Sequence, residues 1–373
     1  MSIAIPAPRS ELVEGIDAPL SLISPDGSRR HEPVLDPHLG DVDETVLTDL
    51  YVDMAVVRRL DEEAFALTRQ GELVLWPPSR GQEAAQVGAA RAIRDDDFVF
   101  GSYREHAFAL LRGVDLGEML SVWRGAALSG WDPLVHRLAP SQIIIGAQTL
   151  HATGYAMAAR RAGGDDIALA CFGDGATSEG DVNEAMVFAS SFRAPVVFLC
   201  QNNQYAISEP VRVQSATPLA LRATGFGIPA LRVDGNDVLA VRAAVRLAAE
   251  HARSGKGPSF VEAVTYRMGP HTTTDDPARY RDDAEVAAWR AKDPLDRLER
   301  HLARIGAPVD RIREEAGIRC DALAARLRDA VVRAEAPAPE TLFDHVLTAP
   351  TRRLERQRAE HLAFAASVEG GAR

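Results

Sequence analysis

The stretch that decides the fold is CFGDGATSEGDVNEAMVFASSFRAPVVFLCQNN, residues 171–203. It connects two apolar runs, 167–172 and 195–200, through a segment with apolar residues at helical spacing over 181–190. Gly-Asp-Gly follows the first run and Asn-Asn closely follows the second. Because a strand–helix–strand unit of this kind forms a right-handed crossover between parallel strands, the stretch predicts a parallel sheet.

The same alternation continues downstream. Apolar runs at 230–233 and 259–266 enclose a segment of helical periodicity that we expect to begin with Asn236 as its N-cap and to end near Arg253. The pattern predicts the α/β class, with a mostly parallel, doubly wound sheet and helices on both faces. We expect three parts: an N-terminal arm over 1–40, the α/β domain over 41–283, and a helical C-terminal region over 284–373.

Composition excludes several functions. The 373 residues carry a net charge of -11, which argues against binding nucleic acid or an anionic membrane surface. Residues 138–159 lack Asp, Glu, Lys and Arg, but their Gln, Thr and His side chains argue against a membrane span. The three cysteines, at 171, 200 and 320, form no close-spaced pair. Reduced thiols in a cytoplasmic protein are therefore expected.

The motifs after the two runs predict a site for a metal and a diphosphate. In a parallel α/β sheet, ligands bind outside the carboxyl ends of the strands, so Asp174 and Asn203 should reach the same edge. Gly173 and Gly175 let the backbone approach a phosphate. Carboxylate and amide oxygens suit Mg²⁺, which takes its other ligands from phosphates and water.

Together, Gly-Asp-Gly and Asn-Asn resemble the thiamine diphosphate signature. From about Leu47 to Asp293 the chain is similar to the alpha subunit of the decarboxylating component of 2-oxo acid dehydrogenase complexes. The resemblance implies thiamine diphosphate and Mg²⁺ as cofactors, with Asp174, Asn203 and the backbone carbonyl of Tyr205 as metal ligands. The separation of 29 positions (203 minus 174) fits the family pattern.

Further segments carry the resemblance. GSYREHAFALLRG at 101–113 matches a Tyr-Arg pair that contacts the diphosphate, and GPHTTTDDPARYR at 269–281 matches a loop whose catalytic histidine is His271 here. Ile145 aligns with an aliphatic wedge that bends the cofactor, although the residues alone equally allow a core position. The implied cofactor-binding set is Tyr103, Arg104, Ile143, Ile145, Gly173, Asp174, Gly175, Ala176, Asn203, Tyr205, Ile207 and His271.

The resemblance also implies partners. The glutamate that activates the cofactor belongs to a beta subunit in this family, so we expect two alpha and two beta chains, with a lipoyl-bearing acyltransferase as acceptor. SEGD at 178–181 is shared with branched-chain relatives, whereas LSGWDPLVHRLAP at 128–140 replaces the Gly-Gly-Ser-Met-His of many relatives that use pyruvate or acetoin. Gln201 stands where some branched-chain relatives have a phosphate-binding Arg.

We therefore expect oxidative decarboxylation of a branched 2-oxo acid. Four alternatives stay open from the sequence: the alpha subunit of a pyruvate dehydrogenase, that of an acetoin dehydrogenase, the amino-terminal half of a split transketolase, and a partner subunit without catalytic function.

Overall fold

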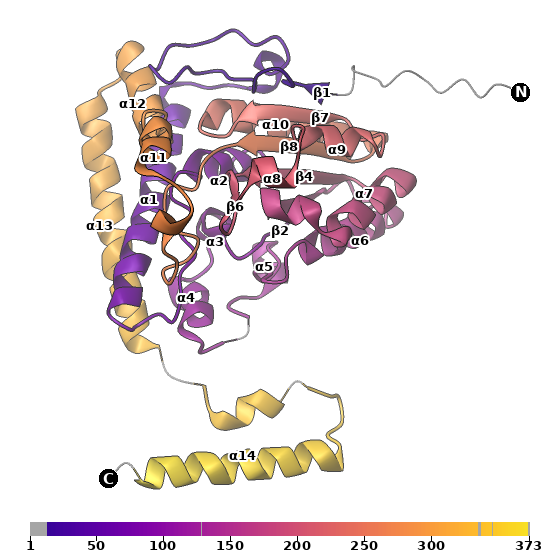
Figure 1. The fold of residues 1–373 in the computed structure, drawn as a ribbon, viewed down its shortest axis with the longest axis vertical. Coiled ribbons are helices and arrows are strands. Elements are labelled where there is room, and N and C mark those ends of the chain that lie inside the picture. The colour runs from indigo at the N-terminus through magenta and orange to yellow at the C-terminus, as the bar shows by residue number, and fades with distance from the viewer. Residues whose placement is uncertain (1–12, 128, 335–336, 345, 372–373) are drawn as a thin grey trace, which may run out of the picture.

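A parallel sheet forms the centre of the protein (Figure 1). The structure is a computed structural model that describes residues 13–127, 129–334, 337–344 and 346–371. Six strands pair in the order β1-β7-β8-β4-β3-β2, and every neighbouring pair is parallel. They are β1 (Val13–Glu14), β2 (Phe98–Phe100), β3 (Ala168–Gly173), β4 (Val196–Asn202), β7 (Ala230–Asp234) and β8 (Ser259–Val264). The α/β prediction is confirmed.

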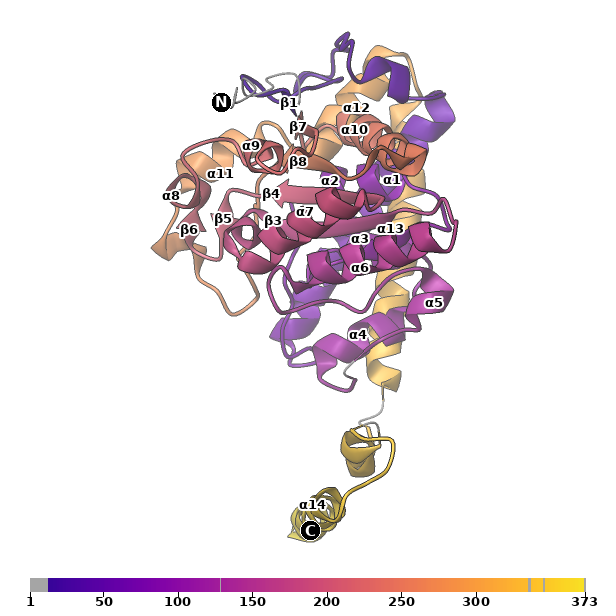
Figure 2. The same ribbon diagram turned by 90° about the vertical axis from the view of Figure 1, so that its right-hand side faces the viewer.

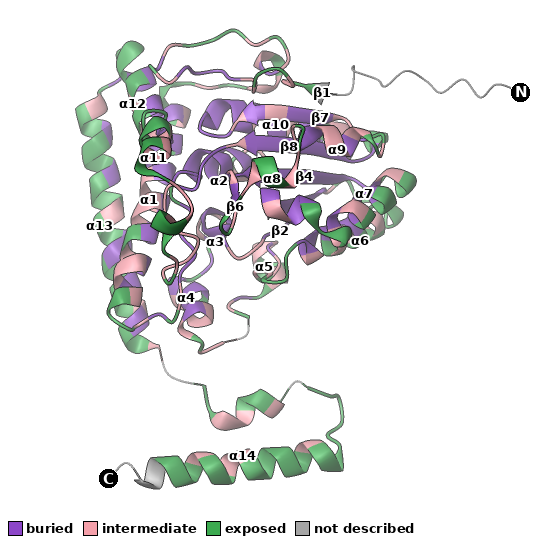
Figure 3. Cartoon of the chain, in the orientation of Figure 1, coloured by how far each residue is buried: buried purple, intermediate pink, exposed green. Residues whose placement is uncertain are grey.

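Helices cover both faces of the sheet (Figure 2). Along β3, Ala168, Ala170 and Phe172 join one apolar cluster, and Leu169 and Cys171 join the other. The first cluster includes side chains of α6 (Ala147–Arg161), α7 (Gly180–Phe192) and α9 (Ala220–Thr224); the second includes those of α1 (Glu44–Arg69), α2 (Glu83–Ala90) and α10 (Val238–His251). Figure 3 shows the strands as the most continuously buried part of the chain. This is the doubly wound arrangement that the sequence predicts.

The remaining elements are short or lie in the C-terminal region. They are α3 (His106–Leu111), α4 (Leu116–Arg124), α5 (Pro133–His136), α8 (Val211–Gln214), α11 (Asp283–Arg290), α12 (Pro294–Arg304), α13 (Val309–Arg333), α14 (Arg352–Gly371), the two-residue strands β5 (Tyr205–Ala206) and β6 (Glu209–Pro210), and the single turns η2 (Asp36–His38), η3 (Asp174–Ser178), η4 (Ala252–Lys256), η5 (Pro277–Arg279) and η6 (Pro339–Phe343). Helix α13 packs along α1. Helix α14 has its main contacts with η6, and α14 and η6 lie apart from the sheet (Figure 1).

No helix among the described residues combines the length and apolar character needed to cross a membrane.

The start of α10 corrects one detail of the sequence analysis. We expected Asn236 as the N-cap, but the side chain of Asp237 accepts hydrogen bonds from the backbone N–H groups of Leu239 and Ala240. Asn236 instead accepts a hydrogen bond from the Thr265 hydroxyl through its amide oxygen. Adjacent Asn and Asp are both good caps, so local propensity did not separate them.

Asp237 also fixes part of the N-terminal segment. Its second carboxylate oxygen accepts hydrogen bonds from the backbone N–H groups of Leu22 and Ile23, both at 2.6 Å, and from the Ser21 hydroxyl at 3.0 Å. Although we expected an arm over 1–40, the segment from residue 13 onward adds β1 to the edge of the sheet and buries Leu22 and Ile23. Residues 1–12 lie outside the described part, and the three-part division of the chain stays a prediction.

Replacing Asp237 with Ala should lower the free energy of unfolding by about 3 kcal/mol, because one buried carboxylate both caps a helix and satisfies two backbone N–H groups of another segment. Asp43→Ala is the matched control. Asp43 caps only the exposed start of α1, through Val46, and its loss should cost about 1 kcal/mol. Urea unfolding measures the loss of unfolding free energy in both variants. Equal losses would show that Asp237 acts only as a cap.

Candidate active site

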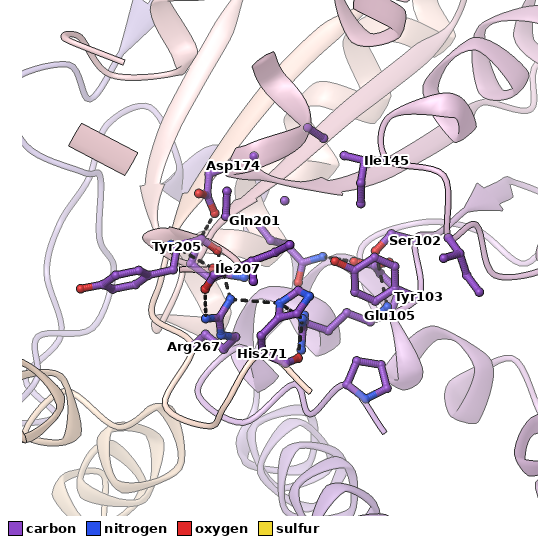
Figure 4. A pocket seen from close by; sticks show the side chains of 18 of the residues that line it. Ser102, Tyr103, Glu105, Ile145, Asp174, Gln201, Tyr205, Ile207, Arg267 and His271 are labelled. Carbon is purple, nitrogen blue, oxygen red and sulfur yellow. Dashed lines mark hydrogen bonds between the residues drawn. The ribbon is translucent and has the colours of Figure 1, made fainter. Parts of the chain in front are cut away.

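A cavity of about 460 Å³ opens at the carboxyl edge of the sheet. Its wall is formed by residues that follow β2, β3, β4 and β8 and by the loop before α6. Figure 4 shows several of these side chains converging on one space. All twelve residues of the predicted cofactor-binding set line it: Tyr103, Arg104, Ile143, Ile145, Gly173, Asp174, Gly175, Ala176, Asn203, Tyr205, Ile207 and His271. Residues up to 168 positions apart in the chain therefore meet in one place, while their individual roles stay predictions.

Strand register brings Asp174 and Asn203 together. β3 and β4 pair Gly173 with Gln201, so the residues that follow each strand emerge side by side. The backbone N–H of Asn203 donates to Asp174 Oδ1 at 3.2 Å, and Gln214 Nε2 donates to Asp174 Oδ2 at 3.3 Å. Asp174 is 1% exposed, and this burial raises its pKa to about 6. A buried carboxylate with two long hydrogen bonds is a favourable place for a cation.

The turn after β4 has an unusual backbone. Gln204 and Ile207 have φ angles of 77° and 56°, in the left-handed region that a β-branched residue such as Ile207 rarely adopts. The amide oxygen of Asn203 accepts a hydrogen bond from Tyr205 N at 3.3 Å. A Cβ on Gly175 would lie 2.7 Å from the Ala206 Cβ, so this hairpin packs where only glycine fits. The turn therefore fixes Asn203 and Tyr205, both of which line the cavity.

Two buried arginines surround His271. Arg104 donates to the backbone carbonyls of Pro78 and His271, at 2.6 and 3.0 Å. Arg267, which follows β8, donates to the carbonyls of Tyr205 and Ile207 at 3.1 and 2.6 Å. Arg267 thus ties the loop that carries His271 to the turn after β4, and backbone oxygens fix both guanidinium groups.

The His271 imidazole is neutral in this setting. Its Nδ1 lies 3.2 Å from Arg104 Nη2 and 3.4 Å from Arg267 Nη1, which are obligate donors, so Nδ1 accepts and Nε2 carries the proton. Burial, followed by the charges of Arg104 and Arg267, lowers the pKa of His271 to about 3. A ring with this pKa does not exchange protons near neutral pH. The structure instead presents a neutral ring that can donate a hydrogen bond from Nε2.

Several polar residues of the cavity were missed or given no role. Gln82 Oε1 accepts a hydrogen bond from Asn203 Nδ2 at 3.1 Å and so orients the Asn203 amide, while Gln82 Nε2 is buried and has no partner among the residues that the structure describes. Glu105 and Gln148 are also buried in the wall. The only signal in the sequence for Gln82 is that two polar residues, Gln82 and Glu83, directly precede an Ala-rich segment. Neither has a distinctive spacing.

The cavity also has exposed apolar residues. Ile143, Ile145 and Ile207 line it and are 63%, 42% and 57% exposed. The neighbouring Ile144 is 69% exposed. Large aliphatic side chains gathered on two loops beside a cavity are typical of a surface that another chain covers.

The fold and the site define an α/β protein with a charged, partly apolar cavity at the carboxyl edge of a parallel sheet. The family model described as "Dehydrogenase E1 component" matches residues 51–341. The chain belongs to this dehydrogenase E1 component family.

Curated relatives agree with this assignment. The chain is 46% identical over 343 residues to the 3-methyl-2-oxobutanoate dehydrogenase subunit alpha of Mycobacterium tuberculosis, covering 92% of this chain and 93% of the relative. It is 37% identical over 329 residues to the pyruvate dehydrogenase E1 component subunit alpha of Acholeplasma laidlawii, covering 87% and 94%. The Staphylococcus aureus pyruvate dehydrogenase E1 component subunit alpha is 40% identical over 269 residues, covering 71% and 72%.

Replacing Arg104 with Gln should raise the pKa of His271 from about 3 towards its usual value near 6.5, because one of the two nearby positive charges is removed. NMR of labelled histidine, recorded against pH, measures the shift. Arg193→Gln, at an exposed arginine after α7, should leave it unchanged.

The low pKa of His271 should make the folded chain less stable at acid pH. The unfolded His271 binds a proton below about pH 6.5, whereas the folded one does so only near pH 3, so acidification through this window favours unfolding. This pH range should be narrower in Arg104→Gln, because the pKa of the folded His271 is higher there. An unchanged His271 titration would show that burial alone sets the pKa.

Proposed function

We propose that this chain is the alpha subunit of a branched-chain 2-oxo acid dehydrogenase, a 3-methyl-2-oxobutanoate dehydrogenase that transfers a 2-methylpropanoyl group to a lipoyl group. The observation that carries the proposal is the 46% identity, over 92% of the chain, to a subunit of that name. The pyruvate dehydrogenase relatives are 37% and 40% identical to this chain, and pyruvate is therefore the alternative substrate. We place the chain in the cytoplasm, and its three free cysteines support this location.

The cavity fits thiamine diphosphate with Mg²⁺. Asp174 is buried, and Asn203 and Tyr205 line the same cavity, so the Asp174 carboxylate, the Asn203 amide oxygen and the Tyr205 carbonyl would hold the metal. At Gly173, which lines the cavity, an added Cβ would meet no protein atom within 4 Å, so the space there is free for a ligand. The cations Arg104 and Arg267 would balance the charge of the diphosphate.

The chain's own residues bind and orient more than they react. When bound, thiamine diphosphate supplies the nucleophilic carbon and the electron sink for decarboxylation. His271 would donate a hydrogen bond from Nε2 to an anionic oxygen at the reacting centre, and the two arginines keep its ring neutral for that task. Ile145 would support the bent cofactor, with Tyr103, Ile143 and the other lining residues of the set completing its binding.

The proposal includes a beta subunit, in an assembly of two alpha and two beta chains, and a lipoyl-bearing acyltransferase. The exposed isoleucines 143, 144, 145 and 207 support a partner chain that covers this side of the cavity. Such a partner would exclude water from the reacting centre and add the carboxylate that activates the cofactor.

The substrate is tested by comparing kcat/KM for 3-methyl-2-oxobutanoate and pyruvate, using this chain co-purified with its beta subunit, Mg²⁺, thiamine diphosphate and an artificial electron acceptor. We expect the branched acid to be preferred by tenfold or more, about 1.4 kcal/mol in transition-state binding. A tenfold preference for pyruvate would overturn the substrate assignment and leave the cofactor site standing.

Replacing Asp174 with Asn should weaken Mg²⁺-dependent binding of thiamine diphosphate at least a hundredfold, because the metal loses its only charged protein ligand. Calorimetric titration of the assembled enzyme measures this. Asp181→Asn, on the first turn of α7 and outside the cavity lining, should bind as the wild type does. Equal affinities of the Asp174 variant and the wild type would place the metal elsewhere.

A further inference from the structure

Glu262 has a fully buried carboxylate that does not line the cavity. It lies on β8, and its side chain is on the face of the sheet where Phe260 packs with α9. Arg232, its partner residue on β7, places Nε 3.6 Å from Glu262 Oε2 and balances the charge. Both carboxylate oxygens also accept hydrogen bonds, and each of these bonds leads to a turn that borders the cavity.

The first oxygen sets the orientation of the Asn202 amide. Asn202 Nδ2 donates to Glu262 Oε1 at 2.8 Å, and a carboxylate offers no donor, so the Asn202 amide oxygen must point the other way. That oxygen accepts hydrogen bonds from Gln204 N at 3.2 Å and from Gln204 Nε2 at 3.0 Å. The left-handed backbone of Gln204 is therefore held by an acceptor that Glu262 has oriented. The same turn carries Asn203 and Tyr205.

The second oxygen holds α9, which in turn holds the turn after β3. Glu262 Oε2 accepts a hydrogen bond from the backbone N–H of Ala220 at 2.9 Å, at the start of α9. Arg222, also on α9, donates to the Thr177 carbonyl at 2.6 Å and to the Thr177 hydroxyl at 3.0 Å. The Thr177 hydroxyl donates to the backbone carbonyl of Asp174 at 2.7 Å. This series of hydrogen bonds connects Glu262 to η3, the turn that carries Asp174.

We propose that Glu262 is a positioning residue for the metal site, because it holds the turns after β3 and β4 at the same time. The inference rests on the proposed function, since it takes Asp174, Asn203 and Tyr205 as the metal ligands. Mg²⁺ demands near-ideal octahedral geometry, so a small shift of either turn should weaken its binding. The two asparagines of the Asn-Asn pair then have different tasks: Asn202 orients the turn, and Asn203 lines the cavity.

Glu262→Gln breaks one of the two connections. Glutamine has a single side-chain oxygen, so it can accept a hydrogen bond from Asn202 or from Ala220, but not from both. We expect this variant to bind Mg²⁺ at least about tenfold more weakly than the wild type, the usual effect of losing an outer partner of a metal ligand. Calorimetric titration of the assembled enzyme with Mg²⁺, in the presence of thiamine diphosphate, measures the affinity. Wild-type affinity would overturn the inference.

Adding Asn202→Asp to Glu262→Gln should restore binding. In the double variant the new glutamine can donate to the new aspartate and still accept from the Ala220 N–H, while the aspartate keeps an acceptor for Gln204. All the hydrogen bonds are then made with the donor and acceptor exchanged between positions 202 and 262. We expect an affinity for Mg²⁺ within about threefold of the wild type. If the double variant binds no more tightly than Glu262→Gln, the inference is overturned.

Val261→Ala is the matched control for a loss of stability. Val261 precedes Glu262 on β8, is equally buried and packs on the opposite face of the sheet. Losing two methyl groups there should lower the free energy of unfolding but leave both turns in place, so Mg²⁺ should bind as in the wild type. Equal weakening in Val261→Ala and Glu262→Gln would overturn the inference, because general destabilisation would explain both.

Hydrogen exchange tests the positioning without the cofactor. Mass spectrometry of the cofactor-free assembled enzyme should show faster exchange in Glu262→Gln at the backbone N–H groups of residues 174–178, 203–207 or both, and near wild-type exchange in the double variant. Exchange in Glu262→Gln that equals the wild type at both turns would overturn the inference. A wild-type enzyme that binds no thiamine diphosphate is a separate result, which overturns the proposed function and leaves the exchange measurement valid.

Discussion

Parallel pairing of β3, β4 and β8 is the constraint on which the site depends. The register places Gly173 beside Gln201 and Asn202 beside Val264, so three strands end within a residue or two of one another. Every chain segment that leaves this edge must then turn within a small space, and polar side chains on those turns are forced together. A one-residue slip of β4 would exchange its two faces and remove Asn203 from Asp174. The hydrophobic faces of the strands therefore determine the geometry of the polar site.

Charge in the cavity is arranged by burial rather than by ion pairs. Asp174 is nearly inaccessible to water, and both arginines hold backbone carbonyls rather than carboxylates. Backbone dipoles orient each of these groups without neutralising its charge. Each group can therefore still interact electrostatically with a ligand. The same arrangement explains why His271 is neutral, since an imidazolium would be a third positive charge beside Arg104 and Arg267. These charges fit the proposed binding of an anion together with a cation.

The sequence predicted most of the sheet because β3, β4 and β8 are continuous apolar runs bounded by turns, and such runs leave little doubt about strand identity. The family resemblance implied twelve residues that the structure brings to one cavity, whereas the position of motifs at strand ends predicted only Gly173, Asp174, Gly175 and Asn203 among them. The sequence did not predict the contribution of Gln82. Its importance comes from a tertiary neighbour, Asn203, that lies 121 positions away. The capping choice between Asn236 and Asp237 failed for the same reason, because the N-terminal segment that selects Asp237 is more than 200 positions distant.

The strand-end residues and the exposed isoleucines of the cavity differ in chemistry, and this difference bears on assembly. The side formed by the strand ends is polar and buried, and hydrogen bonds fix its side chains in the single chain. Beside them, the loop before α6 exposes Ile143 and Ile144, and the turn after β4 exposes Ile207. Water in contact with these side chains is costly, and a cavity open to water weakens every electrostatic interaction within it. The proposed beta subunit would relieve both costs at once by covering the isoleucines, so assembly would also form a dry reaction site.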